Sequence, residues 1–487
     1  MTAKVTNSLK QTLGKLLETS VDSDATELYY MALGRSLEWD PSDTPPVIGD
    51  SDVTSLAFQR KVRHALHSYK VLSGSNMIID KVNWSSGIYY AYDDALDVQS
   101  TNHYVVNSIG QVFLCLEQGK NASGATISSS VEPLASMRIN HQAAKPNGIG
   151  KNNGNFSFRT SDTGADTTQG YLWQYLYTPS PNDINNYGTT SLYPAKKVTP
   201  AAGLLPQDSD NLDLQNASIG GQILSIILDS AGSGYSTAPT ISFTGNGTGG
   251  SFVADLSGGS TVKNVYMDSA YGQSAHGSGY DYATVVFTGG GATTPAAGRA
   301  IIGPQNGPTA DPVQTLRANR LMLQGSFEND ESGNILTDND FRQVAIISNP
   351  KQYGSTAAFT GNTAQALQIL RLQGGGTAFV EDVYFKQNAS VGIAVHWDAG
   401  ANELYFYQNE ETGFGEFVNA DAVNALTGLN GTLQTGDGFA MAAAGGGDVV
   451  TQPVIDRYSG EVLYIHNQVD VSRAINQTED VKLIISF

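Results

Sequence analysis

Short runs of β-branched and aromatic residues, separated by Gly, Asn, Ser and Asp, make up most of the chain from Met77 onward. Such runs predict strands joined by tight turns, because branched and aromatic side chains suit a pleated surface and the separating residues favour turns. Charged residues are only 15% of the 487, and 23 Tyr and 17 Phe are available for burial, which argues against disorder. We therefore expect a mainly β fold.

The predicted strands are 28–33, 77–84, 88–92, 103–109, 111–117, 171–178, 319–327, 343–348, 378–385, 391–397, 403–407, 461–466 and 481–487. The segment 140–168, which is nearly all Gly, Asn, Ser, Thr and Lys, is expected to be an exposed loop.

Two helices are expected near the N-terminus. The first has leucines at helical spacing, namely Leu9, Leu13, Leu16 and Leu17. The second, capped by Asp52, is expected to continue through Leu66 and Tyr69. Its polar face is the one basic cluster of the chain, made of Arg60, Lys61, Arg63, His64, His67 and Lys70. Arg60, Lys61 and Arg63 are candidate partner-docking residues, with a solvated face as the plainer alternative.

The middle of the chain contains an internal repeat. Residues 223–245 and 262–289 each read as a strand, a GSGY turn and a second strand that ends in Thr-Gly, and they start 39 positions apart (223 and 262). Gly234 and Gly279 are predicted to have positive φ, and Tyr235 and Tyr280 to cover a small apolar face. The segment 217–305 is therefore predicted to be an inserted β module.

A second inserted β module is predicted at 362–447. The core is then discontinuous and comprises 1–216 with the N-terminal helices, 306–361, and the C-terminal strands of 448–487. Because each insert is expected to close on itself, a core without residues 217–305 is expected to fold.

Composition disfavours several classes of partner. With 27 Lys+Arg against 46 Asp+Glu the net charge is −19, so a nucleic-acid partner is not expected. No apolar run approaches the ~20 residues that span a bilayer, and no secretion signal or membrane insertion is expected. Cys115 is the single cysteine and cannot form an intrachain disulfide, which suits a reducing cytoplasm or a site that needs no covalent links.

Nucleotide motifs are present only in part. Gly245, Gly247 and Gly250 match G-x-G-x-x-G after a strand, but the following residues favour a strand rather than the helix that would hold a pyrophosphate. Gly119-Lys120 and Gly150-Lys151 lack the Ser/Thr and the preceding Gly of a phosphate-binding loop. We expect no cofactor.

Catalytic and metal-binding patterns are equally incomplete. His64 and His67 share a spacing of three but have no third ligand nearby in sequence. Two acidic clusters deviate from the calcium-loop pattern, so an irregular calcium site stays open against solvated loops. These clusters are Asp208, Asp210 and Asp213, and Glu328, Asp330 and Glu331. Asp93-Asp94 could serve a glycosidase, but adjacent strand residues face opposite sides. We expect no enzyme and commit to no catalytic or metal residue.

Several segments, in order along the chain, resemble the baseplate wedge family known as gene product eight of T-even-like contractile-tailed bacteriophages. They are LGRSLEW (33–39), VNWSSGIYYAYDD (82–94), VFLCLEQ (112–118), GYLWQYLYTPSPND (170–183), FRQVAIISNP (341–350), RYSGEVLYIHNQ (457–468) and INQTEDVKLIISF (475–487). The resemblance covers roughly 28–200, 312–350 and 455–487. The excess length over the family falls in the two predicted inserts.

This resemblance implies a layered β-sandwich core with two flanking helices, forming a homodimer within each wedge. It implies a structural virion protein of the tail baseplate, assembled in the host cytoplasm, that joins neighbouring wedge proteins and moves with them when the baseplate rearranges. Tyr-rich, uncharged strands suit such extended interfaces. The alternatives are a carbohydrate-binding or adhesive virion protein acting through the inserts, which only the GSGY repeats and the surface-type composition suggest, and a polysaccharide-degrading tail enzyme.

Overall fold

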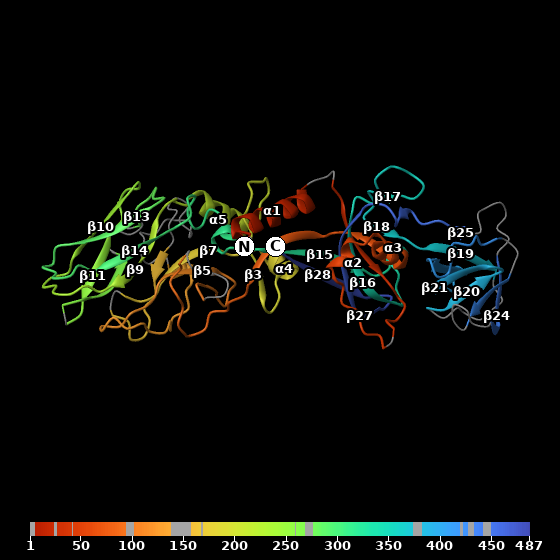
Figure 1. Ribbon diagram of the computed structural model, residues 1–487, viewed down its shortest axis with the longest axis horizontal. Helices are drawn as coiled ribbons and strands as arrows, with labels where there is room; N and C mark the ends of the chain where they lie inside the picture. Colours follow the sequence, from red (N-terminus) through yellow and green to blue (C-terminus); the bar gives the residue numbers. More distant parts are fainter. Residues whose placement is uncertain are drawn as a thin grey trace. The chain divides into compact units, whose positions relative to one another are not determined.

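The protein folds into two compact, mainly β units, which confirms the predicted fold class. The computed structural model describes residues 5–23, 27–40, 42–93, 102–137, 157–166, 169–258, 260–267, 276–373, 382–418, 422–426, 433–441 and 450–487 (Figure 1). The first unit comprises 1–18, 76–322 and 484–487, and the second comprises 19–75 and 323–483. None of the helices in these described ranges is long and apolar enough to cross a membrane.

The first unit contains most of α1 (Asn7–Ser23) and β3 (Gly74–Asp80), and all of the following elements. Its helices are α4 (Pro181–Tyr187), α5 (Pro206–Asn216) and α6 (Pro312–Thr315). Its strands are β4 (Tyr104–Val106), β5 (Val112–Glu117), β6 (Ser157–Arg159), β7 (Leu172–Tyr177), β8 (Leu192–Pro194), β9 (Ile223–Ser230), β10 (Thr240–Gly245), β11 (Phe252–Leu256), β12 (Val262–Met267), β13 (Ala283–Thr288) and β14 (Ala297–Ile302).

An aromatic core stabilises the sheet β4-β5-β7-β6 of this unit. Trp173 of β7 lies against Tyr171 in a stacked arrangement and against the edge of Tyr89, with ring centroids 5.7 and 5.4 Å apart. Every residue of β5 and β7 is buried, so both faces of these strands are covered. This explains why they read as continuous apolar runs rather than as alternating ones.

The two sequence repeats form an intertwined module with internal twofold pairing. The equivalent strands β10 and β13 pair with each other, and β9 pairs with β14 (Figure 1). Strand β11 pairs with β12. The first strand of each repeat therefore pairs with the strand that follows the other repeat. Bridges Ser233–Thr294 and Thr248–Ser278 obey the same symmetry. All six strands lie within the predicted insert 217–305, and neither repeat could satisfy its backbone alone.

The predicted turn chemistry of the repeats is confirmed. Gly234 and Gly279 have φ of +78° and +73°. Tyr235 and Tyr280 are buried, and the Tyr280 hydroxyl donates to the Gly249 carbonyl at 2.8 Å. The residues after the Gly-rich motif form strand β11 and not a helix, as the sequence indicated.

The second unit is built on the sheet β18-β2-β1-β16-β27, whose strands come from three distant regions of the chain. Its helices are α2 (Asp50–Thr54) and α3 (Leu56–Ala65). Its other elements are β1 (Tyr29–Gly34), β2 (Leu66–Val71), β16 (Asn339–Ser348), β17 (Lys351–Gln352), β18 (Thr363–Gln365), β26 (Ile455–Asp456) and β27 (Glu461–Arg473), together with most of β15 (Arg320–Glu328) and β28 (Thr478–Ser486). Tyr30, Tyr69 and Ile347 are among the fully buried residues of its core.

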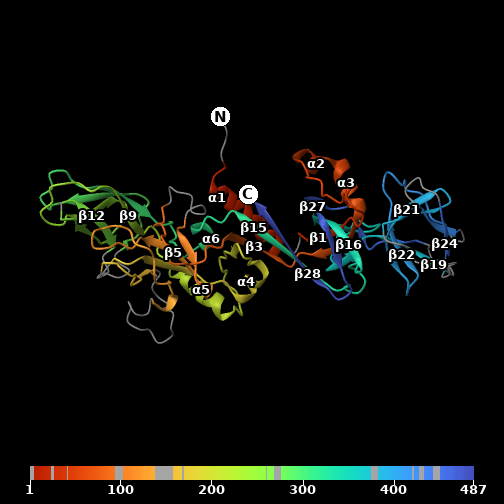
Figure 2. The same ribbon diagram turned by 90° about the horizontal axis from the view of Figure 1, so that it is seen from below.

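A closed barrel forms the rest of the second unit. It consists of β19 (Gln368–Gln373), β20 (Tyr384–Gln387), β21 (Ser390–Asp398), β22 (Glu403–Tyr407), β23 (Ala422–Leu426) and β24 (Leu433–Met441), with the short β25 (Val450–Thr451) beside β19 (Figure 2). Because β19 also pairs with β22, the sheet closes on itself. Closure leaves few free strand edges. The barrel interior is filled by Leu370, Phe385, Leu404, Phe406 and Phe417.

The predicted second helix is wrong in its C-terminal half. It is divided into α2 and α3, and the cap of α3 is Ser55, whose hydroxyl accepts from Phe58 N, rather than Asp52. The chain then becomes strand β2, which pairs with β1 on one side and β18 on the other. Pairing with two neighbouring strands favours a strand here more strongly than the helical spacing of Leu66 and Tyr69 favours a helix.

Other local predictions differ in detail. The predicted strand 88–92 is not a strand of any sheet, although Tyr90 N donates to the Asn102 carbonyl and Tyr92 N to the Cys115 carbonyl. Most of the predicted loop 140–168 and the start of the predicted strand 378–385 lie outside the described residues. Residues 363–365, placed in the second insert by the sequence, belong to the core sheet as β18.

The two GSGY glycines offer a matched test of the repeat geometry. A Cβ on Gly234 would lie 2.3 Å from Thr293 Oγ1 and 2.7 Å from its backbone N, whereas a Cβ on Gly279 would meet nothing closer than 4.0 Å. Asn tolerates positive φ better than other non-Gly residues. We expect Gly279→Asn to cost under about 1 kcal/mol and Gly234→Asn about 3 kcal/mol or more in urea unfolding. Equal costs would contradict the packing difference.

Candidate functional site

The predicted basic surface on α3 is largely used inside the protein. Arg63 is buried, and its guanidinium donates to the carbonyls of Arg457, Ser459 and Gly460. Lys70 lies on β2 and pairs with Glu331 at 2.6 Å. Arg63 is therefore corrected from a docking residue to an internal anchor of the 457–460 turn. Only Arg60 and Lys61 of the three candidates are exposed.

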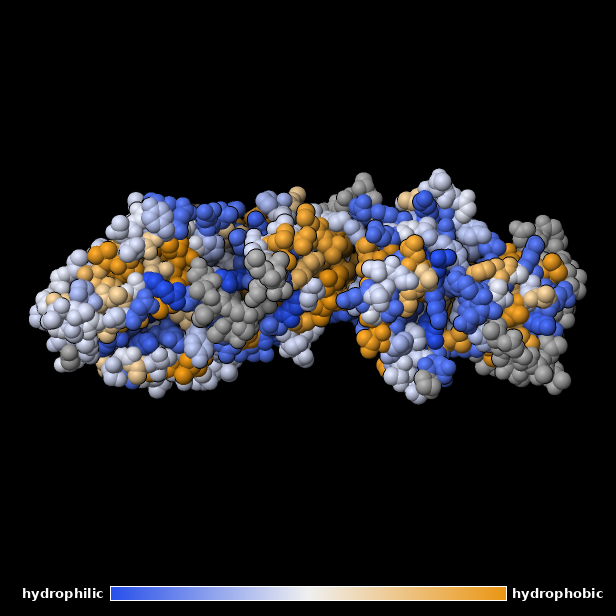
Figure 3. All heavy atoms as spheres, viewed as in Figure 1, coloured by the Kyte–Doolittle hydropathy of each residue, from blue (hydrophilic) through white to orange (hydrophobic). Residues whose placement is uncertain are grey.

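Helix α1 carries an apolar surface that the described residues leave uncovered. Its inward face is small and polar: Gln11 donates to the Val313 carbonyl at 3.1 Å, and Gly14 lies against Met77. Three of the four leucines that predicted the helix are exposed, at 49%, 45% and 62% for Leu9, Leu13 and Leu16, whereas Leu17 is half-buried. Apolar surface gathers over α1 in Figure 3. We call Leu9, Leu13 and Leu16, with the exposed Val5, the α1 stripe.

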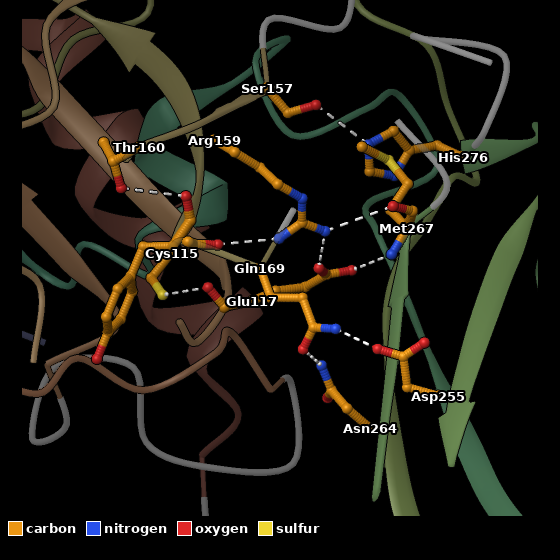
Figure 4. A network of polar contacts seen from close by, with 12 residues as sticks. Cys115, Glu117, Ser157, Arg159, Thr160, Gln169, Asp255, Asn264, Met267 and His276 are labelled. Carbon is orange, nitrogen blue, oxygen red and sulfur yellow. Dashed lines mark hydrogen bonds and ion pairs between the residues drawn. The ribbon is translucent and has the colours of Figure 1, made fainter. Parts of the chain in front are cut away.

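A buried polar network joins the repeat module to the aromatic sheet (Figure 4). Glu117, the last residue of β5, forms an ion pair with Arg159 of β6 and accepts from Met267 N of β12 at 2.7 Å. Arg159 also donates to the Gly170 carbonyl at 3.0 Å. Since both charges are almost fully buried, each depends on the other to offset desolvation.

The same junction contains a polar pocket of about 240 Å³. Gln169 bridges to the hairpin β11-β12, donating to Asp255 and accepting from Asn264 Nδ2 at 2.8 Å. Lys263 donates to the Ala122 carbonyl at 2.7 Å. Because these lining groups mostly bind one another across the junction, we read the pocket as part of the attachment of the module.

His276 ties the module to β6 by two contacts. Its Nδ1 lies 2.8 Å from the Ile223 carbonyl and its Nε2 3.2 Å from Ser157 Oγ. A carbonyl only accepts, so Nδ1 carries the proton and Nε2 accepts from the serine. Complete burial lowers the pKa of His276 to about 4, so the ring is neutral at physiological pH.

The residues of the two acidic clusters have structural surroundings other than a calcium loop. Asp208, Asp210 and Asp213 lie on helix α5, not on a loop, and burial raises the pKa of Asp208. Glu331 is engaged by Lys70 and by the backbone N of Glu328. Among the described residues no group of three or more His, Cys, Asp or Glu could hold a metal ion.

The remaining chemical candidates have internal partners. Asp93 is buried and pairs with Arg299 of the repeat module, while Asp94 lies outside the described residues. Cys115 is fully buried, which raises the pKa of its thiol well above the ordinary value and makes it a poor nucleophile. Lys120 donates to Thr126 at 2.7 Å, as a structural rather than phosphate-binding lysine. Gly150-Lys151 lies outside the described residues.

Comparisons with protein-family models and with curated proteins find no match to this chain. Sequence reasoning identified the α1 leucines but assigned them no exposure. It missed the Glu117–Arg159 pair, whose members are 42 residues apart. A charge inside the apolar run VFLCLE was the available signal.

Arg63 and Arg60 provide a matched pair on one helix. Arg63→Ala removes three hydrogen bonds from a buried turn, so we expect a loss of roughly 3 kcal/mol in urea unfolding. Arg60→Ala removes an exposed side chain and should change the unfolding free energy by less than about 0.5 kcal/mol. Similar small effects for both would mean that Arg63 does not anchor the 457–460 turn.

His276 predicts a specific acid sensitivity. The unfolded chain binds the proton near pH 6.5 and the folded chain only near pH 4, so the stability is complete above 6.5 and is lost as pH falls toward 4. Between pH 6.5 and 4.5 this loss amounts to about 2 kcal/mol. In His276→Gln the measured drop in unfolding free energy should be smaller by that amount. His466→Gln, at an exposed position, should retain the full drop.

Proposed function

We propose that this protein is a structural, non-enzymatic subunit of the tail baseplate wedge of a contractile-tailed phage. The observation that carries the proposal is where the resembling segments lie. FRQVAIISNP (341–350) supplies most of β16. On one side β16 pairs with β27, which contains most of RYSGEVLYIHNQ, and on the other with β1, whose last two residues begin LGRSLEW. VFLCLEQ and GYLWQYLYTPSPND form the paired strands β5 and β7. Segments that resemble the family are thus neighbours in the two cores.

The α1 stripe supports a role in assembly. A soluble helix normally turns its leucines inward, and here the buried residues are instead Gln11 and Gly14, with Leu17 half-buried. Exposed apolar rows of this kind mark surfaces that a partner covers. The proposed partners are a second copy of the chain, giving the expected homodimer, and neighbouring wedge proteins. Arg60 and Lys61 offer a separate, basic surface to an acidic partner.

The proposed role is tested in a phage whose copy of this gene carries an early stop codon. Without complementation we expect particles that lack assembled contractile tails in electron micrographs. A plasmid copy of the wild type should restore tails, whereas Leu9→Gln/Leu13→Gln/Leu16→Gln should not, although it folds, because the substitutions are exposed. Complete tails without the gene product would overturn the structural role.

The matched control is Val47→Gln/Val469→Gln/Ile475→Gln, which removes three other exposed apolar side chains and should restore tails. Light scattering of the purified chains identifies the occupant of the α1 stripe. A monomeric α1 variant beside a dimeric control places a second copy there, and a dimeric α1 variant places another wedge protein there. Restoration of tails by the α1 variant would refute the interface while leaving the structural role intact.

A further inference from the structure

A pocket of about 270 Å³ in the second unit is lined by exposed aromatic rings. Five aromatic side chains are strongly exposed in the part of the chain that the structure describes, and three of them, Tyr353, Phe414 and Tyr458, line this one pocket. The other two, Tyr90 and Tyr282, lie in the first unit. Exposed rings are costly to leave in water, so their concentration at one pocket indicates a binding role.

The polar lining of the pocket is dominated by neutral amides. Gln368, Gln408 and Gln452 contribute three carboxamides. Gln368 Nε2 donates to Gln452 Oε1 at 3.1 Å, which leaves an acceptor on one amide and a donor group on the other. Among the described residues these two atoms and the Tyr353 hydroxyl have no hydrogen-bond partner. Adjacent free donors and acceptors match vicinal hydroxyls, each of which both donates and accepts.

The walls of the pocket are held in place by the fold. Tyr353 follows β17, which pairs with β26, and its N–H donates to the Val454 carbonyl at 2.8 Å. Tyr458 lies in the turn that Arg63 holds, and its hydroxyl is 2.8 Å from His64 Nδ1 in a hydrogen bond. The ring of His64 also lies 5.6 Å from that of Phe414. The rings are therefore positioned before any ligand arrives.

Phe414 is presented by a turn that is hydrogen-bonded internally. The N–H of Asn409 donates to Thr412 Oγ1, and the N–H of Thr412 donates back to Asn409 Oδ1, both at 2.9 Å. Gln408 Nε2 donates to the Gly415 carbonyl at 3.0 Å and so closes the end of the same turn. These hydrogen bonds fix the conformation of the turn and therefore the position of the Phe414 ring.

Charge selects against an acidic ligand. The ionic groups of the lining are Asp456, Glu416 and Arg457, and the guanidinium of Arg457 is buried and donates to the His64 carbonyl at 2.8 Å. The carboxylates outnumber the cation, and the whole chain has a net charge of −19. Sialylated, uronic or phosphorylated chains are therefore repelled.

We propose that this pocket binds a neutral saccharide, with sugar C–H faces against Tyr353 and Phe414 and hydroxyls on Gln368 and Gln452. Its volume is below the roughly 300 Å³ at which pockets for drug-sized ligands begin, so it holds one terminal or branch sugar of a longer glycan. The sequence-based alternative placed glycan binding on the GSGY repeats. The pocket proposed here instead lies where the barrel meets the core of the second unit. The proposal does not depend on the proposed baseplate role.

The test uses the purified full chain and an immobilised panel of neutral gluco-, galacto-, manno- and xylo-oligosaccharides, sialylated and uronic-acid glycans, and unmodified peptides. We expect binding to at least one neutral oligosaccharide, confirmed by saturation-transfer NMR. Tyr353→Ala and Gln452→Ala should each weaken that binding at least tenfold. Both side chains are exposed, so unchanged circular dichroism is expected.

Tyr282→Ala is the control, because it removes another strongly exposed tyrosine, one that lies in the repeat module. It should leave saccharide binding unchanged. The proposal is overturned if no neutral oligosaccharide binds, if only acidic glycans or peptides bind, or if Tyr353→Ala binds as the wild type does. Loss of binding in Tyr282→Ala would likewise overturn it and place the glycan site on the repeats.

Discussion

Buried arginines bound to backbone carbonyls hold the second unit together. Arg63 holds the 457–460 turn, Arg457 donates back to the His64 carbonyl, and Arg473 donates to the carbonyls of Leu336 and Asn329. Arg342 binds the Ser36 carbonyl and the Asp43 carboxylate. A guanidinium has five donors in a fixed plane, so it can fix several turns at once. In a chain with one buried cysteine, these contacts connect distant segments as disulfides would elsewhere.

The need to pair every backbone group then determines how the inserts are built. When a sheet is built from distant segments, the chain between two of its strands forms an insert. The strands of that insert must also pair their backbone groups and leave few free edges. The barrel does this by pairing β19 with β22 and closing. The repeat module does it by exchanging strands between its two halves, so that β9 completes its pairing on β14 and β12 on β11. Different topologies meet the same constraint.

Local pattern predicted the strands that packing favours. β1, β5, β7 and β16 were found from their β-branched and aromatic runs because these strands are buried over nearly their whole length. Strand β2 was missed, because its polar residues Ser68 and Lys70 interrupt the apolar pattern expected of a strand. It is a strand because its neighbours pair with it. Closure of the barrel and strand exchange depend on long-range pairing, which periodicity does not encode.

The sites were harder to predict than the strands for the same reason. Whether Arg63 is solvated or buried depends on residues nearly 400 positions away, and the pocket rings come from residues 353, 414 and 458. The spacing on α3 therefore indicated which residues are charged, but not whether each one is exposed or buried in internal contacts.

The surface stays strongly acidic. Four buried arginines (Arg63, Arg342, Arg457 and Arg473) are matched by five buried carboxylates among the described residues, those of Asp93, Glu117, Asp162, Asp183 and Asp208, so burial leaves the acidic excess of the composition at the surface. Surface potential acts over roughly 8 to 10 Å in physiological salt, so it discriminates among ligands before contact. An acidic exterior repels polyanions and leaves neutral recognition through rings, amides and apolar rows. The pocket and the α1 stripe are both of this kind, one suited to a neutral glycan and the other to an apolar protein face.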